Sequence, residues 1–391
     1  MNQSLNNQSQ ETASDLFKKG QHLQSNNQIT DSITTYIEAI KIDHELIIDF
    51  FFQLKFVNLN SEQLEQVISF IKDQLEKQPD SHFLYTFLGD LLTKKEQYDE
   101  AINYYRNASY EKVVSCCPEF AKNHWDDSNP RKPNFLIIGF AKSGTTSLHQ
   151  YIEQHPQVLP VVKKEINFWI KQDLDLWESY DFEKGIEWYS SQFPPIGEED
   201  SFVTGEANPW IFLSSQAPKK ILSSFPKVKI LAALRNPVDR TISHYYHMVK
   251  HGQEQRELEE VIDTEISLLE GITNFAQVDR NYWQNQRLYL ATSLYLYGLR
   301  KWFKLFDSDQ LMILKSEDIY NQPEATMKQV FSFLGLPDHK LSEYRNFLPG
   351  SYTSPSSNSD VRRKLLDFFR PYNQELEDYL GISFGWNKSY F

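Results

Sequence analysis

Short apolar runs separated by longer amphipathic segments occupy the chain from about residue 134 onward. Five runs have the length of strands, and they cover residues 135–138, 158–162, 202–206, 228–234 and 311–314. Such runs are typical of strands buried on both faces, and the segments between them are long enough for helices. The alternation predicts an α/β domain of three layers, with a central parallel sheet covered by helices on both faces.

A helical pattern precedes this domain, from Leu16 to about Val114. The pattern repeats at an offset of 69 residues, which places Gly20 on Gly89. The same offset relates two further pairs, Ile33 with Ile102 and Tyr36 with Tyr105. Half of this offset is about 34 residues, the period of a helix-turn-helix repeat, and residues 64–75 supply a degenerate middle copy. The pattern predicts an all-α region of roughly three repeats.

Residues 17–43 and 84–110 resemble tetratricopeptide repeats. In both segments a glycine stands where paired helices cross closely, and small or aromatic residues fill the seam. The resemblance implies a docking surface for a protein or peptide. An unrelated helical bundle is the alternative interpretation.

Two polar segments mark the domain limits. Residues 1–13 are rich in Asn, Gln and Ser and lack the apolar content to fold, so they predict a disordered tail. Residues 126–133, DDSNPRKP, contain two prolines among turn residues and predict a linker. The expected organisation is therefore a helical-repeat domain over 14–125 and an α/β domain over 134–391.

The composition fits a globular chain with sizeable cores. The chain has 391 residues, 40% of them hydrophobic, and a net charge of −13, which argues against a general nucleic-acid or acidic-membrane binder. No apolar run approaches the roughly 20 residues that cross a bilayer, and the polar first residues lack a signal-peptide core, so a cytoplasmic location is expected. Cys116 and Cys117 are adjacent and match neither a disulfide framework nor metal-ligand spacing.

The segment 135–150 has the pattern of a strand, a phosphate-binding loop and a helix start. Gly139 ends the apolar run, four residues separate it from Gly144, and two threonines with their hydroxyls follow directly. Free N–H groups at a helix start attract an anion, so the segment is similar to a P-loop. A nucleotide-binding P-loop has lysine directly after the second glycine, whereas here Lys142 lies inside the loop. A plain glycine-containing turn is the alternative.

A second basic cluster follows the expected strand 228–234. Arg235 stands at the strand end, and Ser243 lies two helical turns later. A guanidinium binds phosphate bidentately, and a hydroxyl on the same side adds a second contact. The cluster predicts a second phosphate site, although a surface arginine and a solvated serine would give the same pattern.

Together, GFAKSGTTSL at 139–148 and LRNPVDRTISHYYH at 234–247 resemble the sulfotransferases that use PAPS, 3′-phosphoadenosine 5′-phosphosulfate. The resemblance covers roughly residues 134–387. It implies that Arg235 and Ser243 bind the 3′ phosphate and that no metal is needed. It also implies that the loop binds the 5′ phosphosulfate through Lys142, Ser143, Gly144, Thr145, Thr146 and Ser147. Lys142 would in addition stabilise charge on the leaving phosphate.

The resemblance extends to two acidic residues. In VVKKEINFW, Glu165 matches the general base of the branch related to heparan sulfate sulfotransferases, although Asn167 stands where relatives often have histidine. In TGEANPWIF, Glu206 matches a further acidic residue, which would orient Lys142 or the acceptor. A surface charge and a turn-capping carboxylate are the plain alternatives, and a histidine such as His149 or His244 is the fallback base.

The C-terminal segment resembles the family's last loop and helix. Residues 350–357 are expected to form a lid. One of Arg362, Arg363 and Lys364 is expected to reach the 3′ phosphate, which would offset the cost of positive charge at a helix start.

The resemblance implies transfer of a sulfuryl group from PAPS to a hydroxyl or amine of a glycan, lipid or metabolite. One alternative is a repeat-containing adaptor whose second domain binds a nucleotide without turnover. Another is a nucleotide or small-molecule kinase, which the absence of a lysine after Gly144 disfavours.

Overall fold

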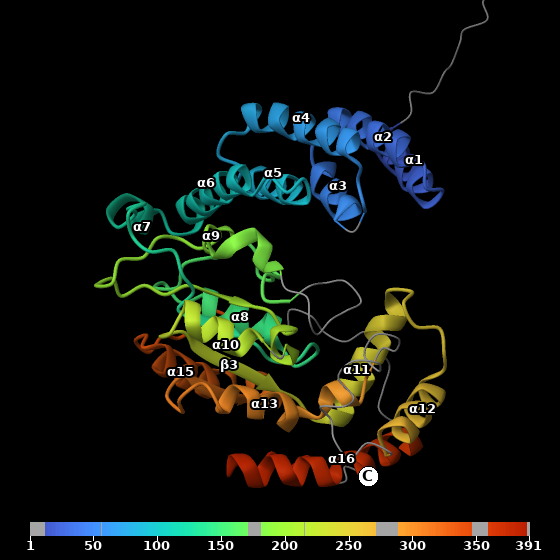
Figure 1. Cartoon of the computed structure of the whole chain (residues 1–391), viewed down its shortest axis with the longest axis vertical. Helices are drawn as coiled ribbons and strands as arrows, with labels where there is room; N and C mark the ends of the chain where they lie inside the picture. Colours follow the sequence, from blue (N-terminus) through green and yellow to red (C-terminus); the bar gives the residue numbers. More distant parts are fainter. Residues whose placement is uncertain are drawn as a thin grey trace, which may run out of the picture. The chain divides into compact units, whose positions relative to one another are not determined.

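The computed structural model describes residues 12–55, 57–170, 181–214, 216–270, 288–345 and 359–388. The chain divides into two compact units, residues 1–111 and 112–391 (Figure 1). The predicted disordered tail 1–13 lies almost entirely outside the described residues. No helix in the described ranges is long and apolar enough to span a membrane.

The described part of the N-terminal unit is helical, as predicted. Its helices are α1 (Ala13–Ser25), α2 (Ile29–Ile42), α3 (Leu46–Leu54), α4 (Ser61–Lys77), α5 (His82–Lys94) and the greater part of α6 (Tyr98–Cys116). Polar side chains fix two of the helix starts: Thr12 caps α1 and Asn60 caps α4, each in a capping box. The helices are stabilised in addition by buried aromatic side chains such as Tyr36, Phe50 and Phe87.

The helices of this unit repeat at the offset found in the sequence. α1 and α5 begin at Ala13 and His82, 69 residues apart. A Cβ added to Gly20 would lie 2.6 Å from the ring of Tyr36, and one added to Gly89 would lie 2.6 Å from the ring of Tyr105. Glycine is therefore required in both copies because an aromatic ring of the next helix packs on its backbone. Membership of the tetratricopeptide family stays a prediction.

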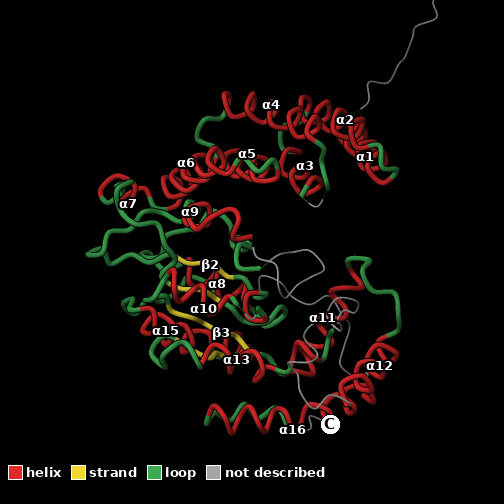
Figure 2. The backbone as a smooth tube through the Cα atoms, in the orientation of Figure 1, coloured by secondary structure: helices red, strands yellow, loops and turns green. Residues whose placement is uncertain are grey.

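The second unit contains a parallel four-stranded sheet (Figure 2). Its strands are β1 (Phe135–Ile137), β2 (Gly205–Ala207), β3 (Lys229–Leu234) and β4 (Leu311–Lys315). The spatial order is β2-β1-β3-β4, and all neighbouring pairs are parallel. The predicted α/β architecture is confirmed, and β1 lies at the centre, between β2 and β3.

Some helices of this unit pack on the sheet, and others pack on one another. They are α7 (Pro118–Asn123), α8 (Thr145–Glu153), α9 (Gly185–Ser190), α10 (Ala217–Ser224), α11 (Pro237–Lys250), α12 (Leu258–Glu270), α13 (Tyr295–Phe303), α14 (Ser316–Asn321), α15 (Pro323–Leu334) and α16 (Ser359–Leu380). One apolar core joins the strands to α8, α14 and α15, with Phe135, Leu148 and Phe331 fully buried. A second core joins α11, α12 and α16.

The strand predicted over 158–162 is wrong. This segment makes only an isolated parallel bridge between Val158 and Val203, with Leu159 donating its N–H to the Val203 carbonyl at 2.8 Å. Beyond Leu159 the backbone bonds to other groups, because the Val161 carbonyl accepts from the Lys112 ammonium at 2.7 Å and the Val162 N–H donates to the Gln192 carbonyl at 3.0 Å. The strand predicted over 202–206 is displaced, because Val203 makes only this bridge and regular pairing with β1 runs from Gly205 to Ala207.

The boundary between the compact units falls inside α6 and not at the predicted linker 126–133. Val113 and Phe120 pack with Leu159 and Ile196 in a small core of the second unit. Within the linker, Arg131 donates to the Phe193 carbonyl at 2.7 Å. Residues 112–133 therefore belong by packing to the α/β unit, which their own sequence pattern did not indicate.

Candidate active site

The phosphate loop connects β1 to α8 at the carboxyl edge of the sheet. A Cβ added to Gly139 would lie 2.6 Å from the backbone of Ala233 in β3, so only glycine fits. Gly144 has φ +83° and Lys142 has φ +74°, both in the left-handed region. This region is unfavourable for lysine, and strained backbone of this kind is often found at functional sites.

The start of α8 is suited to an anion. Gly144 occupies the N-cap position and provides no side-chain cap, so the first N–H groups of the helix point out of its end. The Ser143 hydroxyl is buried and has no hydrogen-bond partner among the residues that the structure describes. Ser147 accepts a hydrogen bond from the Tyr320 hydroxyl at 3.3 Å, and Thr145 is buried. These groups are suited to bind an anion.

Positive charges gather at this loop. Arg235 follows β3, and its Nη1 donates to the Lys142 carbonyl at 3.0 Å. Burial lowers the pKa of Lys142, and the charges of Arg235 and Lys250 lower it further. The sequence analysis did not single out His247, which lies near this cluster. Burial and the neighbouring charge of Lys142 lower the pKa of His247 to about 4, so it is a further functional candidate. All the charged groups that shift the pKa of Lys142 are cations, which favours an anionic ligand.

On α11, Ser243 and Arg240 occupy the inner face. Ser243 is only 4% exposed, so its side chain lies on the buried face of the helix. Arg240 donates to Ser293 Oγ at 2.5 Å and to the Ala141 carbonyl at 3.4 Å. It therefore connects α11 with the phosphate loop and with the short 3-10 helix Ala291–Ser293. Burial lowers the pKa of Arg240 to about 10. The sequence analysis did not single out Arg240, and its place one turn after the helix start was the available signal.

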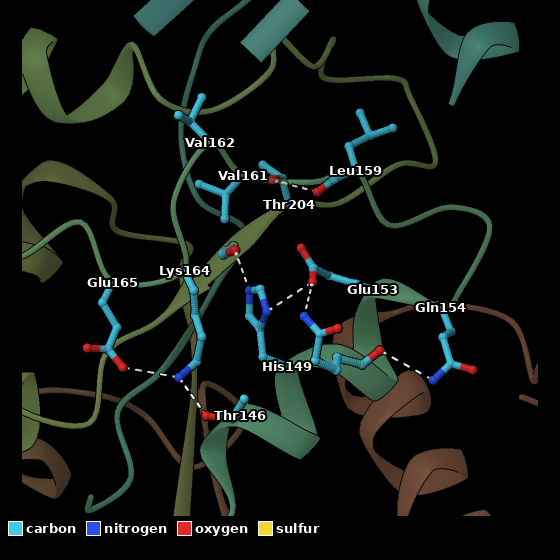
Figure 3. Close-up of polar contacts among 12 residues, drawn as sticks. Thr146, His149, Glu153, Gln154, Leu159, Val161, Val162, Lys164, Glu165 and Thr204 are labelled. Carbon is cyan, nitrogen blue, oxygen red and sulfur yellow. Dashed lines mark hydrogen bonds and ion pairs between the residues drawn. The ribbon is translucent and has the colours of Figure 1, made fainter. Parts of the chain in front are cut away.

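Glu165 lies on a short segment that β2 holds in place, residues 163–167, which we call the strap. The predicted strand before it is absent, and two bonds to β2 fix the backbone instead: the Ala207 N–H donates to the Lys164 carbonyl at 3.2 Å, and the Ile166 N–H donates to Glu206 Oε2 at 3.1 Å. The Lys164 ammonium donates to Thr146 Oγ1 at 2.9 Å and to Glu165 Oε1 at 3.1 Å (Figure 3). The structure thus brings Glu165 beside the start of α8.

Glu206 is in the interior, inside β2. It has no exposed surface, and besides the strap it accepts a hydrogen bond from the Tyr189 hydroxyl at 3.2 Å. Burial raises the pKa of Glu206 to about 8, against the lowering effect of its two hydrogen bonds. Its hydrogen bonds reach the strap and Tyr189, and Lys142 is not among their partners. Its position suits support of the strap better than contact with an acceptor.

Asn167 lies on the strap two residues after Glu165. Its Oδ1 accepts a hydrogen bond from Asn208 Nδ2 at 2.9 Å, and its φ is +59°. Asparagine tolerates this left-handed conformation better than most residues. The two asparagines therefore fix the strap on the side away from Lys164.

The fallback histidines are both buried. His149, on α8, pairs through Nδ1 with Glu153 at 3.2 Å and approaches the Gly205 carbonyl through Nε2 at 3.4 Å (Figure 3). His244 is 6% exposed and packs against Tyr289. Neither has the exposure of Glu165, whose side chain is 38% exposed.

The three basic residues at the start of α16 have different partners. Arg362 pairs with Asp239 in the first turn of α11 at 2.8 Å, close in sequence to Arg235. Arg363 pairs with Asp360 on the surface, and Lys364 pairs with Glu259 and Asp263 of α12. Arg362 is thus the residue of the three that bonds to the helix carrying Ser243. The lid predicted over 350–357 lies outside the described residues.

A family model described as "Sulfotransferase domain" matches residues 132–359, more than half of the chain. The chain belongs to the sulfotransferase family. The match begins within the predicted linker and includes the phosphate loop, the strap and α11.

Curated relatives of this sulfotransferase include heparan sulfate enzymes. The mouse "Bifunctional heparan sulfate N-deacetylase/N-sulfotransferase 4" is 29% identical over 269 residues, covering 63% of this chain and 30% of the relative. The "Membrane-associated sulfotransferase kil1" of Dictyostelium discoideum is 25% identical over 324 residues, covering 65% of this chain and 66% of the relative. The chain therefore spans less than a third of the length of the bifunctional relative.

A solved sulfotransferase structure shares the fold. The crystal structure of the sulfotransferase from Alicyclobacillus acidocaldarius matches with a TM-score of 0.50 and 25% identity, covering 66% of this chain and 99% of that chain. The parallel sheet with its helices is therefore the fold of a known sulfotransferase.

Proposed function

We propose that this sulfotransferase moves the sulfuryl group of PAPS to a hydroxyl or amine of an acceptor. The observation that carries the proposal is the positive charge around Lys142 in the phosphate loop: Arg235 donates to the Lys142 carbonyl, and the charges of Arg235 and Lys250 lower the pKa of Lys142. A donor with two phosphate positions supplies the negative charge that this cluster needs. Lys142 and the α8 N–H groups would bind the phosphosulfate. Arg235, Ser243 and Arg362 are the residues proposed for the 3′ phosphate.

Bound PAPS supplies a sulfuryl group on a phosphate leaving group. The acceptor oxygen or nitrogen forms a bond to sulfur while the bond from sulfur to the phosphate oxygen breaks. Lys142 stabilises the charge that develops on that phosphate oxygen. Glu165 takes the acceptor's proton, which its partial exposure beside α8 permits. Glu206 holds the strap from inside.

For the acceptor, a glycan is the class that we propose first. The names of the mammalian relatives refer to heparan sulfate, which is a glycan. The two other acceptor classes expected from the sequence, lipid and small metabolite, have no such support. A peptide- or protein-docking role for the helical unit and a cytoplasmic location also stay predictions.

Thermal unfolding with added nucleotide tests the donor assignment. We expect PAP, the desulfated product, at 100 times its Kd to stabilise the fold by about 2.7 kcal/mol, and EDTA to change nothing. ATP with magnesium is the control ligand. A clear preference for ATP with magnesium would favour the kinase, and PAP binding without any sulfuryl transfer would favour the adaptor.

A panel of acceptors addresses the second half of the proposal. Radiolabelled PAPS is incubated with polysaccharides, small metabolites and proteins in separate reactions. Label in the polysaccharide fraction is the expected result. Label confined to another fraction would retain the sulfotransferase but exclude a glycan.

A further inference from the structure

Lys164 makes two bonds that connect separate parts of the candidate site. Its ammonium donates to Thr146 Oγ1, in the first turn of α8, at 2.9 Å and to Glu165 Oε1, on the strap, at 3.1 Å (Figure 3). The Lys164 side chain is 25% exposed, so solvent screens this bridge less than it would screen a surface pair. One side chain thus bridges the phosphate loop's helix and the candidate base.

The Glu165 carboxylate depends on this bridge. Within the described ranges, Lys164 is the only group that forms a hydrogen bond or ion pair with that carboxylate. The strap backbone is fixed independently, by Ala207 and Glu206 of β2. Loss of the Lys164 side chain would therefore release the Glu165 side chain without releasing the backbone that carries it.

We propose that Lys164 is a positioning residue that sets the Glu165 carboxylate relative to the sulfuryl donor. This inference rests on the proposed function of the site. A base works efficiently only when it is held within hydrogen-bond reach of the proton that it removes. Thr146 belongs to the helix start that would hold the phosphosulfate. The bridge therefore fixes the position of the Glu165 carboxylate relative to the donor.

Lys164→Met tests the proposal, since methionine keeps a long side chain but cannot bridge. We expect sulfuryl transfer to fall about tenfold to a hundredfold, in line with the effect of misplacing a catalytic group, while the Kd for PAP changes less than about threefold. Lys164→Arg should recover part of the lost rate. Lys328→Met is the matched control, because Lys328 is a surface lysine, 70% exposed, that also pairs with a carboxylate.

A double variant separates positioning from a direct action on the donor. If Lys164 acts through Glu165, adding Lys164→Met to Glu165→Gln should cost little further rate. A full additional loss in the double variant would overturn the proposal and assign Lys164 to the donor itself. An unchanged rate in Lys164→Met would also overturn it.

A structural readout is independent of the acceptor. Crystals of the full chain with PAP should show one Glu165 rotamer bonded to Lys164, and crystals of Lys164→Met should show that side chain displaced or disordered. The same ordered Glu165 rotamer in both would overturn the proposal. Failure of the proposed function has a different signature, because the unaltered chain would then bind no PAP and transfer no label.

Discussion

Glu165 belongs to the strap and Glu206 to the strand that supports it, and their surroundings differ. The Glu165 side chain is 38% exposed and faces the ammonium of Lys164, whereas Glu206 has no exposed surface and accepts bonds from a backbone N–H and a tyrosine. An acceptor hydroxyl can approach the first carboxyl group but not the second. The two residues therefore have separable roles, one in proton transfer and one in support.

Glu165→Gln should retain PAP binding and lose sulfuryl transfer by about a hundredfold or more, because an amide cannot take the acceptor's proton. Calorimetric titration with PAP and a transfer assay on the same preparation measure the two effects. If Glu206→Gln loses turnover and Glu165→Gln retains it, Glu206 is the base.

Glu206→Gln should make stability less dependent on pH. The pKa of Glu206 is about 8 in the folded chain and 4.5 without the fold, so between these values the folded state binds more protons. Its contribution to stability is therefore present at low pH and falls as pH rises, by up to about 1.4 kcal/mol for each pH unit.

Melting temperatures of both proteins between about pH 5 and about pH 8 measure this effect. Glu265, whose pKa burial raises to about 7, contributes equally to both proteins, so the difference isolates Glu206. If the melting temperatures of the two proteins changed equally with pH across that range, the assignment of a protonated, buried Glu206 would be contradicted.

The phosphate loop is the element on which the site is built, and Gly144 is constrained both by its backbone conformation and by a neighbouring side chain. A methyl group there would lie 2.9 Å from the Tyr320 hydroxyl, in addition to the cost of a φ of +83°. Gly335, at the end of α15, has nearly the same φ of +82° but nothing within 4 Å of an added Cβ. Comparing substitutions at Gly144 and Gly335 therefore separates the effect of backbone strain from the effect of steric crowding.

Gly144→Ala and Gly335→Ala should each lose roughly 1–2 kcal/mol of stability from the left-handed backbone. Only Gly144→Ala should also weaken PAP binding, because its loop must shift to accommodate the methyl group. Denaturant unfolding and calorimetric titration give the two quantities. Equal PAP affinity in both variants would show that the loop does not hold the donor.

The elements that the sequence predicted well are those with a strong local signal. β1, β3 and β4 were continuous apolar runs, and the glycines of the phosphate loop and of the helical pairs marked close backbone approach. The prediction of a strand over 158–162 was wrong because its valines are buried but only Val158 makes a bridge, and the backbone beyond it bonds to Lys112 and Gln192. Apolar content alone did not distinguish these two kinds of burial.

The site was predictable to the extent that its residues stand in contiguous motifs. Lys142, Arg235 and Glu165 could be found in this way, and the structure places Arg235 on the Lys142 carbonyl. Lys164 and Arg240 act through tertiary bonds to other elements, which no local pattern specifies. The sequence predicted Glu206 as a strand-end carboxylate. Its complete burial depends on tertiary packing, including the strap residue Ile166 that bonds to it, which the local sequence does not specify.

At the scale of the whole molecule, the chain joins a helical unit to a sulfotransferase unit. α6 begins in the first and ends in the second, so the boundary is a continuous helix and not a linker. The net charge of −13 contrasts with the local cluster at the phosphate loop. Because the chain as a whole is acidic, we expect strong anion binding at the local cluster of cations around Lys142.

Transfer of radiolabel from PAPS by the unaltered chain and by Lys142→Ala, side by side, tests the central claim most directly. The unaltered chain should label one acceptor fraction, and Lys142→Ala should do so at least about a hundredfold more slowly while still binding PAP. Arg235→Ala should instead weaken PAP binding by about tenfold or more. Equal labelling by the unaltered chain and Lys142→Ala, or no labelling of any fraction by the unaltered chain, would contradict the account.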